Sequence, residues 1–339
     1  MSQRAPKDAA IAVLGAGSWG TALAVQFARG GRTVRLWGRD ARQLARMALD
    51  GRNERYLPGT PFPETLRIAA ELPDALKGAH DVLVVVPSQG LRSLLERLAP
   101  LLNDAMRVAW ATKGFEADTG KLPHQVARDV LGAARAGAVL SGPTFAREVG
   151  AGLPTAMTVA SADAAYAQSL ATKLSSENFR AYTSSDIMGV EIGGAVKNAL
   201  AVAAGLSDGL GFGANTRVAL ITRGLREMTR LGVALGAEAQ TFMGLAGLGD
   251  LVLTCTDDQS RNRRFGLLLA TGISPQMALE RIGQAVEGYG AARAIHQVAT
   301  RAGVEMPLCE MAYRVLYERM SAGDAVRTLM SRPVRSEAG

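Results

Sequence analysis

Short runs of apolar residues alternate with segments of helical periodicity through the first half of the chain. The runs are rich in Val, Ile, Leu and Ala and show no strict alternation with polar residues, a pattern typical of strands buried on both faces of a parallel sheet. Helices would cover that sheet, and right-handed crossovers then favour a doubly wound α/β domain. The predicted strands are residues 11–15, 33–37, 81–86, 106–111, 138–141 and 155–160, and the predicted helices are residues 21–29, 42–49, 91–98 and 122–131.

The pattern changes near residues 184–186, where the sequence reads Ser-Ser-Asp. From there to the end strand signals are absent, and long helical patterns follow that Gly and Pro residues separate. The predicted helices in this half are residues 187–206, 217–235, 291–301 and 311–320. The sequence therefore predicts an α/β domain over residues 1–187, followed by an all-α C-terminal domain over residues 188–339.

Composition and charge narrow the class of protein. With 48% apolar and 20% charged residues, the 339-residue chain can bury a core in each of two domains. The net charge of +7 is dispersed, and the sequence contains no basic stripe or nucleic-acid-binding motif. These features favour small anionic ligands over nucleic acid.

The sequence gives little support for a membrane span, a metal site or a disulfide framework. Uninterrupted apolar stretches such as residues 82–87 are far shorter than the roughly 20 residues that cross a bilayer, and the first residues do not form a signal peptide. Two cysteines, Cys255 and Cys309, are too few for a disulfide framework or a structural zinc site. The three histidines are scattered, so no metal site is predicted. We expect a cytoplasmic protein without a membrane span.

The strongest local signal is the glycine-rich turn GAGSWG at residues 15–20, between a predicted strand and a predicted helix. In such a turn Gly15 permits the tight bend, Gly17 lets the backbone approach a pyrophosphate, and Gly20 lets the helix pack closely on the strand. Free N–H groups at the helix N-terminus would face the phosphates. The context predicts dinucleotide binding and makes the N-terminal domain Rossmann-like.

The residues after the second predicted strand bear on which dinucleotide binds. An NAD-selective site would place a carboxylate at the end of that strand to hold the ribose 2′-hydroxyl. Here the strand ends in Trp37 and Gly38, and Arg39 follows, which can pair with a 2′-phosphate. NADP is therefore favoured, while Asp40 one position later keeps NAD open.

Lysine is rare in this chain, and two of the lysines lie in segments that glycines flank. Only six of the 38 basic residues are lysines, and Lys113 and Lys197 are two of them. Lys113 follows a predicted strand, and carboxyl ends of strands in such sheets face the ligand crevice. The segment at residues 141–146 also ends a predicted strand, but by itself it is interpreted as a tight structural turn.

Lys197 lies in an otherwise apolar helical segment that contains Gly193 and Gly194. Glycines inside a helix cost about 1 kcal/mol each relative to alanine and are tolerated where something approaches the backbone closely. Apolar surroundings would lower the pKa of Lys197 toward the working range of a general acid or base. A lysine that extends from a buried helix to solvent is the competing interpretation.

A second glycine-rich segment, residues 244–249, leads into Asp250, which lies among apolar residues. A buried carboxylate needs a partner, and a lysine is the obvious candidate. Further along, Ser260, Arg261 and Asn262 offer donors for an anion such as phosphate. The alternative interpretation of the basic run at residues 261–264 is a solvated helix turn that binds no ligand.

Taken together, these segments resemble bacterial NAD(P)-dependent glycerol-3-phosphate dehydrogenases. The resemblance spans nearly the whole chain, in the family's order, and includes the aromatic Trp19 of the glycine-rich turn. The matching segments are residues 15–20, 36–39, 84–88, 110–114, 141–146, 193–198, 209–215, 245–256, 260–265 and 286–288.

By this resemblance the protein interconverts dihydroxyacetone phosphate and sn-glycerol 3-phosphate with NADP(H), and also NAD(H), and supplies glycerophospholipid synthesis. Lys197 would donate a proton to the C2 carbonyl oxygen, Asp250 would orient and charge-balance that lysine, and Lys113 would polarise the substrate. The residues expected to hold the substrate are Lys113, Gly142, Thr144, Lys197, Asn198, Asp250, Ser260, Arg261 and Asn262. Those expected to contact the cofactor are Gly15, Gly17, Ser18, Trp19, Gly20, Arg39, Lys113, Ala146, Arg261, Val286 and Glu287.

Two other functions are also compatible with the sequence. A β-hydroxyacid dehydrogenase of the 6-phosphogluconate or hydroxyisobutyrate type also joins a dinucleotide-binding domain to a helical domain with a lysine–asparagine pair, although that pair is spaced differently from Lys197 and Asn198. A non-catalytic NADP-binding sensor would require that Lys113, Lys197 and Asp250 be incidental. A homodimer is compatible with each of these interpretations.

Overall fold

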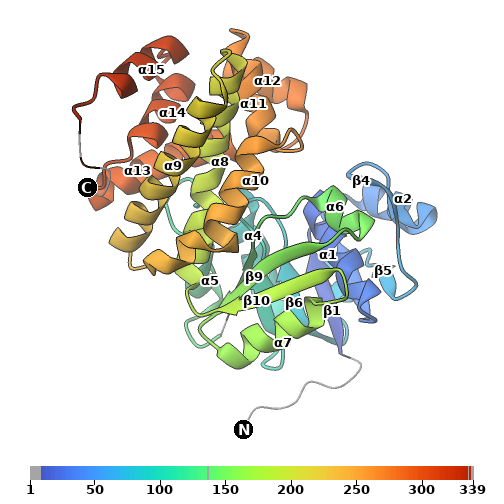
Figure 1. Ribbon diagram of the computed structural model, residues 1–339. Coiled ribbons are helices and arrows are strands. Elements are labelled where there is room, and N and C mark those ends of the chain that lie inside the picture. The colour runs from blue at the N-terminus through green and yellow to red at the C-terminus, as the bar shows by residue number, and fades with distance from the viewer. Residues whose placement is uncertain (1–8, 136, 335, 337–339) are drawn as a thin grey trace.

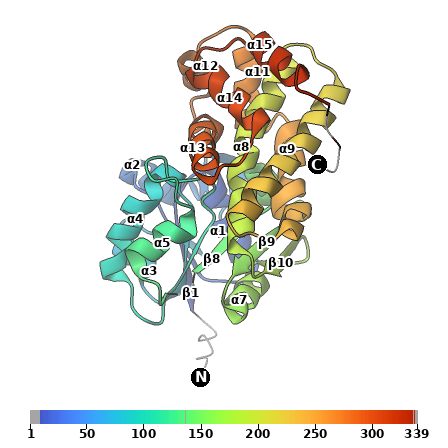
Figure 2. The same ribbon diagram turned by 90° about the vertical axis from the view of Figure 1, so that its left-hand side faces the viewer.

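The computed structural model describes residues 9–135, 137–334 and 336. A sheet with helices on both faces forms one half of the molecule, and helices alone form the other (Figure 1). The view turned by 90° separates the same two halves, with α8 (Ile187–Gly209) leading from the sheet into the helices (Figure 2). The α/β class followed by a helical C-terminal part is therefore confirmed.

The sheet has eight strands in the order β10-β9-β8-β7-β6-β1-β2-β5. All six strands that the sequence predicted are present, and the order changes direction between β1 and β6, which marks the crevice where ligands of such sheets bind. The strands are β1 (Ala10–Leu14), β2 (Val34–Trp37), β5 (Leu66–Ile68), β6 (Ala79–Val84), β7 (Arg107–Trp110), β8 (Gly137–Ser141), β9 (Thr155–Ser161) and β10 (Phe179–Ser184).

The expectation of a wholly parallel sheet is wrong at one edge. β9 runs antiparallel to β8, and β10 runs parallel to β9. The connection from β8 contains only the six-residue helix α6 (Ala146–Ala151), and the chain re-enters the sheet at the end where β8 stops. A helix that short does not carry the chain back along a full strand, so the next strand returns in the opposite direction.

Helices cover the sheet, and a short strand pair lies outside it. Strands β3 (Arg52–Asn53) and β4 (Leu57–Pro61) pair with each other close to α1. The central strand β1 is buried along its whole length, as expected for a strand covered on both faces. The remaining helices of this half are α1 (Ser18–Arg29), α2 (Ala41–Asp50), α3 (Leu72–Leu76), α4 (Leu91–Leu98), α5 (Pro123–Leu131) and α7 (Ala164–Leu174).

The long helix α8 is the centre of the helical half. In the part of the chain that the structure describes, no strand follows Ser184. α8 packs against most of the other helices of this half, and its most extensive contact is with α11 (Arg261–Ala270). The other helices of this half are α9 (Ala214–Ala234), α10 (Asp250–Thr256), α12 (Pro275–Ile282), α13 (Glu287–Ala302), α14 (Pro307–Tyr317) and α15 (Ala322–Met330).

Two glycines explain how closely α8 and α11 approach. A Cβ atom added to Gly205 would lie 2.0 Å from the carbonyl oxygen of Arg263, and one added to Gly266 would lie 2.1 Å from that of Val202. No larger side chain fits between these backbones without shifting a helix. The contact sets the N-terminal turn of α11 beside the middle of α8.

By length and composition alone α8 is long and apolar enough to cross a membrane, which the expectation from uninterrupted apolar runs did not anticipate. In the structure, 83% of its most apolar stretch is buried among the protein's own residues. The apolar character of α8 is accounted for by its place at the centre of a packed core.

Candidate functional site

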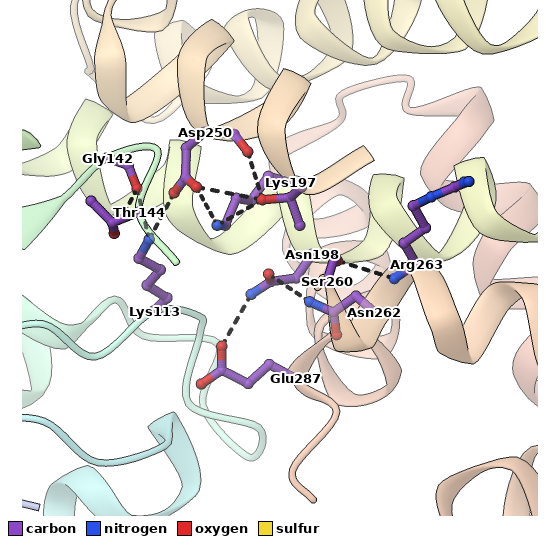
Figure 3. Close-up of polar contacts among 11 residues, drawn as sticks. Lys113, Gly142, Thr144, Lys197, Asn198, Asp250, Ser260, Asn262, Arg263 and Glu287 are labelled. Carbon is purple, nitrogen blue, oxygen red and sulfur yellow. Dashed lines mark hydrogen bonds and ion pairs between the residues drawn. The ribbon is translucent and has the colours of Figure 1, made fainter. Parts of the chain in front are cut away.

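Two lysines and one aspartate meet where the sheet faces α8 (Figure 3). Nζ of Lys197, on α8, lies 2.5 Å from Oδ1 of Asp250, the first residue of α10. Nζ of Lys113, in the loop after β7, lies 2.7 Å from Oδ2 of the same carboxylate. Asp250 is only 1% exposed. The sequence-based prediction that a lysine pairs with Asp250 is therefore confirmed, and the structure supplies a second lysine.

Burial changes the acidity of this cluster. Desolvation lowers the pKa of Lys197 to about 8, and the nearby ammonium of Lys113 acts in the same direction, while the carboxylate of Asp250 opposes both. Nζ of Lys197 also donates a hydrogen bond to Oγ1 of Thr254, at 3.0 Å. The amine can therefore both give and take a proton near neutral pH. The direction of the shift agrees with the sequence-based expectation.

The sequence analysis overlooked Thr254. It lies four residues after Asp250 on the same helix and is 5% exposed. Its hydroxyl donates to the carbonyl oxygen of Asp250, at 2.6 Å, and accepts from Lys197. The i,i+4 spacing from Asp250 is a signal that could have placed it on the same face as the carboxylate.

The two glycines before Lys197 have separate neighbours. A Cβ atom on Gly193 would lie 2.3 Å from the carbonyl oxygen of Ala246, in the π-helical turn Leu245–Gly249 that precedes Asp250. A Cβ atom on Gly194 would lie 3.4 Å from Cγ of Lys113. The predicted close approach to the backbone is therefore confirmed at Gly193, where the turn before Asp250 lies against α8, while Gly194 faces the stem of Lys113.

The turn after β8 also reaches the lysines. The carbonyl oxygen of Gly142 accepts hydrogen bonds from Nζ of Lys113 at 3.4 Å and from Oγ1 of Thr144 at 3.3 Å. Gly142 has a φ of +154°, and a Cβ atom there would lie 2.9 Å from the Cα atom of Met157 on β9. The segment is a tight turn, as interpreted, and it also borders the cluster.

A network of side-chain amides lies beside Lys197. Oδ1 of Asn198 accepts from Nδ2 of Asn262 at 2.8 Å, and Oδ1 of Asn262 accepts from the Gly288 N–H at 2.9 Å. Nδ2 of Asn198 donates to Oε2 of Glu287 at 3.3 Å. Burial raises the pKa of Glu287, and the positive charges of Arg261, Lys113 and Lys197 oppose that shift. The structure thus brings together three residues that the sequence analysis had singled out.

The basic N-terminal turn of α11 contains one engaged and one available arginine. Ser260 caps the helix, since its hydroxyl accepts from the Arg263 N–H at 3.2 Å. Arg263 is nearly buried and forms ion pairs with Asp208 and Asp258. Arg261 is half-buried, and no hydrogen bond or ion pair is found for it among the residues that the structure describes. A cation at a helix N-terminus opposes the helix dipole, so Arg261 favours an anion nearby.

The glycine-rich turn has the geometry that a dinucleotide requires. Gly15 has a φ of +133°, and a Cβ atom there would lie 2.0 Å from the carbonyl oxygen of Val85. A Cβ atom on Gly20 would lie 1.8 Å from the carbonyl oxygen of Gly15, whereas one on Gly17 would meet nothing within 4 Å. The space over Gly17 is what a pyrophosphate needs. The indole N–H of Trp19 is buried without a partner in the described part of the chain.

The other residues expected at the cofactor lie on several elements. Ser18 begins α1, and Arg39 is exposed just after β2. Ala146 is the first residue of α6, and Val286 is the buried residue that precedes α13. In the ranges 9–135, 137–334 and 336, no three His, Cys, Asp or Glu residues form a group that could hold a metal ion.

Comparisons with known proteins agree with this geometry. Residues 10–167 match the family model for the NAD-dependent glycerol-3-phosphate dehydrogenase N-terminus, and residues 186–327 match the model for the C-terminus. The chain is 54% identical over 333 residues to a glycerol-3-phosphate dehydrogenase [NAD(P)+] of Sodalis glossinidius, which covers 98% of each chain.

A second such relative, from Idiomarina loihiensis, is 53% identical over 328 residues, covering 96% of this chain and 98% of the relative. Among solved structures, the fold is similar to that of glycerol-3-phosphate dehydrogenase from Coxiella burnetii. That structure has a TM-score of 0.93 at 47% identity, and the match covers 96% of this chain and all of that one.

Proposed function

Because the chain belongs to the family of NAD-dependent glycerol-3-phosphate dehydrogenases, we propose that the cluster of Lys113, Lys197 and Asp250 is its catalytic centre. The protein is an NAD(P)-dependent oxidoreductase that reduces dihydroxyacetone phosphate to sn-glycerol 3-phosphate, a precursor of glycerophospholipids. The observation that carries the proposal is the sharing of one buried carboxylate by two lysines, one from each half of the molecule.

Lys197 acts as the general acid of the reduction. When bound, the nicotinamide supplies the hydride that C2 of the substrate accepts, so the C2 carbonyl oxygen gains negative charge and must take a proton. Nζ of Lys197 gives that proton, and in the reverse direction the neutral amine takes it back. A pKa of about 8 leaves the group able to do both near neutral pH.

Asp250 and Lys113 prepare this proton transfer. The carboxylate of Asp250 holds both ammonium groups by hydrogen bonds at 2.5 and 2.7 Å, so their mutual repulsion is offset in a nearly dry site. Lys113 polarises the carbonyl and lies within reach of both substrate and cofactor. A preorganised positive charge stabilises the developing alkoxide without reorganising in the reaction.

The phosphate of the substrate binds at the N-terminal turn of α11. Ser260, Arg261 and Asn262 supply hydroxyl, guanidinium and amide donors, and the helix N-terminus adds backbone N–H groups. The turn at Gly142 and Thr144 closes the other side of the substrate site. Asn198 contacts the substrate from α8, beside the proton donor, and is oriented by Asn262.

The cofactor lies over the carboxyl end of β1. The turn at residues 15–20 holds the pyrophosphate, with Ser18 and Trp19 contacting it from the first turn of α1. Arg39 pairs with a 2′-phosphate, which favours NADP(H) over NAD(H). Ala146, Val286 and Glu287 contact the dinucleotide where the two halves of the molecule meet.

Cofactor binding and catalysis are assigned to different halves of the fold. In the proposal, residues 1–187 form the dinucleotide-binding domain and residues 188–339 the helical substrate and catalytic domain. Cys255 and Cys309 are buried free thiols, which favours a reducing compartment and thus a cytoplasmic enzyme. A homodimer is compatible with this arrangement, and sedimentation of the purified protein tests it.

One assay tests the proposed function against its alternatives. The purified protein is mixed with dihydroxyacetone phosphate and either NADPH or NADH, and the loss of cofactor absorbance is followed. We expect turnover with this substrate, faster at low concentrations of NADPH than of NADH. A non-catalytic sensor would bind NADPH without consuming it, and a β-hydroxyacid dehydrogenase would turn over only a hydroxyacid or its keto form.

Replacing Arg39 with alanine tests the preference for the phosphorylated cofactor. We expect the KM for NADPH to rise about tenfold or more, because a charge-assisted contact to the 2′-phosphate is lost, while the KM for NADH changes little. Steady-state kinetics with both cofactors measure this. Equal losses for the two would mean that Arg39 does not contact the 2′-phosphate. Arg67→Ala, an exposed arginine on β5, serves as the control.

Replacing Arg261 with alanine tests the phosphate site. The KM for dihydroxyacetone phosphate should rise about tenfold or more, since a charged hydrogen bond to the phosphate is lost, with a smaller effect on kcat. Arg264→Ala is a matched control, because Arg264 is exposed on the same helix. If both variants keep the KM of the unmodified enzyme, Arg261 is only a solvated arginine.

A further inference from the structure

A buried asparagine outside the main sheet holds the glycine-rich turn. Asn53, on β3, is fully buried, and its Nδ2 donates to the carbonyl oxygen of Ala16 at 3.1 Å. The same Nδ2 donates to Oγ1 of Thr21, on α1, at 2.7 Å. Nε2 of Gln43, on α2, donates to the Ala16 carbonyl as well, at 2.8 Å. Two side-chain amides from separate elements therefore converge on one backbone carbonyl.

The orientation of the Asn53 amide is fixed by its other contacts. Its Oδ1 accepts from the backbone N–H of Tyr56 at 3.3 Å, so the amide nitrogen must face the turn. Both hydrogens of Nδ2 are used, one on Ala16 and one on Thr21. In a fully buried site a reversed amide would leave a donor facing a donor, which is costly. The side chain is thus built to donate to this carbonyl.

The hydrogen bonds to the Ala16 carbonyl also fix the direction of the Gly17 N–H, on the face of the turn where the cofactor is proposed to bind. The Ala16 carbonyl and the Gly17 N–H belong to one planar trans peptide, so they point in opposite directions. With the carbonyl tied to Asn53 and Gln43, the Gly17 N–H points to the opposite side. Gly17 N–H has no acceptor in the described part of the protein, and the space beside the Gly17 Cα atom is free, because a Cβ atom there would meet nothing within 4 Å.

We propose that Asn53 and Gln43 are positioning residues for the dinucleotide, which hold the Ala16–Gly17 peptide with its N–H toward the pyrophosphate and its carbonyl away from it. A reversed peptide would present a carbonyl oxygen to an anion. The inference rests on the proposed binding of the cofactor at this turn. Because NADP and NAD share the pyrophosphate, both cofactors should depend on these residues to the same extent, unlike their dependence on Arg39.

The principal test is Asn53→Asp, which keeps the size of the side chain but removes both donors and sets carboxylate oxygens against the Ala16 carbonyl. Titration of cofactor fluorescence should show the Kd for NADPH and for NADH rising by the same factor, about tenfold or more. The KM for dihydroxyacetone phosphate and kcat at saturating cofactor should stay within about twofold of the unmodified enzyme, since the hydrogen bonds of Asn53 go to Ala16, Thr21 and Tyr56 and not to the lysine cluster.

A milder variant covers the case in which Asn53→Asp does not fold. Gln43→Leu removes one of the two donors from a partly buried position on α2, where leucine is a good helix former. It should raise both Kd values several-fold and equally. Leu49→Gln, 80% exposed on the same helix, is the control and should leave both Kd values unchanged.

The outcomes separate the inference from the proposed function. Folded variants with unchanged Kd values, or with a lower Tm and unchanged Kd values, would show that the two amides serve stability alone and would overturn the inference. A loss confined to NADPH would overturn it as well, because it would assign these residues to the 2′-phosphate. If the unmodified protein bound neither cofactor, the proposed function itself would fail.

Discussion

Replacing Lys197 with methionine should lower kcat for the reduction of dihydroxyacetone phosphate by about 100-fold or more. Methionine fills a similar volume in the apolar surroundings on α8 but has no proton to give. The carbonyl oxygen would then have to take its proton from water, in a site where Lys197 is only 7% exposed. The Kd for NADPH should change little, because the turn at residues 15–20 is untouched.

Stopped-flow and steady-state measurements with NADPH separate the chemical step from cofactor binding. Lys77→Met is the matched control, since Lys77 is an exposed lysine whose ion pair with Asp74 lies on the surface. Near-normal kcat in a folded Lys197→Met protein would remove Lys197 from its role as acid. An equally large loss in Lys77→Met would point to a general effect of removing lysines.

Features of the site that follow from one local physical requirement could be predicted from the sequence. A buried carboxylate needs a cation, and in a chain with six lysines a lysine was the obvious partner for Asp250, while the choice of Lys197 came from the family resemblance. The glycine-rich turn was equally predictable, because its strand–turn–helix context leaves few alternatives. Six of the eight strands of the sheet were predicted from their apolar runs.

What depends on long-range packing could not be predicted. The sharing of Asp250 with Lys113 depends on how the loop after β7 meets α8 and α10, which sequence spacing does not reveal. The amide network of Asn198 and Asn262 depends on how closely α8 and α11 approach. Asn53 lies in a two-residue strand with no apolar pattern, so neither its burial nor its contacts had a local signal.

The edge of the sheet formed by β9 and β10 was also predicted incompletely from the sequence. The β10 segment carries exposed Arg180 and Tyr182, since an edge strand buries only part of its surface, and its apolar signal was too weak to predict. The direction of β9 depends on the length of the helix before it. Apolar periodicity reports burial and not direction, so a parallel sheet was the natural but incorrect extension.

Replacing Asp250 with asparagine should also lower kcat for the reduction by about 100-fold or more, and unlike Lys197→Met it should move the pH profile. Asparagine keeps the shape of the side chain but loses the charge that faces both ammonium groups. In the unmodified enzyme the carboxylate opposes the fall in the pKa of Lys197 that burial causes. Without it that pKa should fall further, so less of the amine carries a proton at neutral pH.

The sign of the shift distinguishes this role from a structural one. Reduction needs the protonated amine, so in the unmodified enzyme its rate should decline as the pH rises through about 8. In Asp250→Asn the decline should begin at a lower pH, and part of the lost rate should return in more acidic buffer. Asp258→Asn is the control, because Asp258 is an exposed carboxylate near the same helix. A uniform loss of rate at every pH, in a variant with the Tm of the unmodified enzyme, would contradict the assignment of Asp250 as the group that sets the acidity of Lys197.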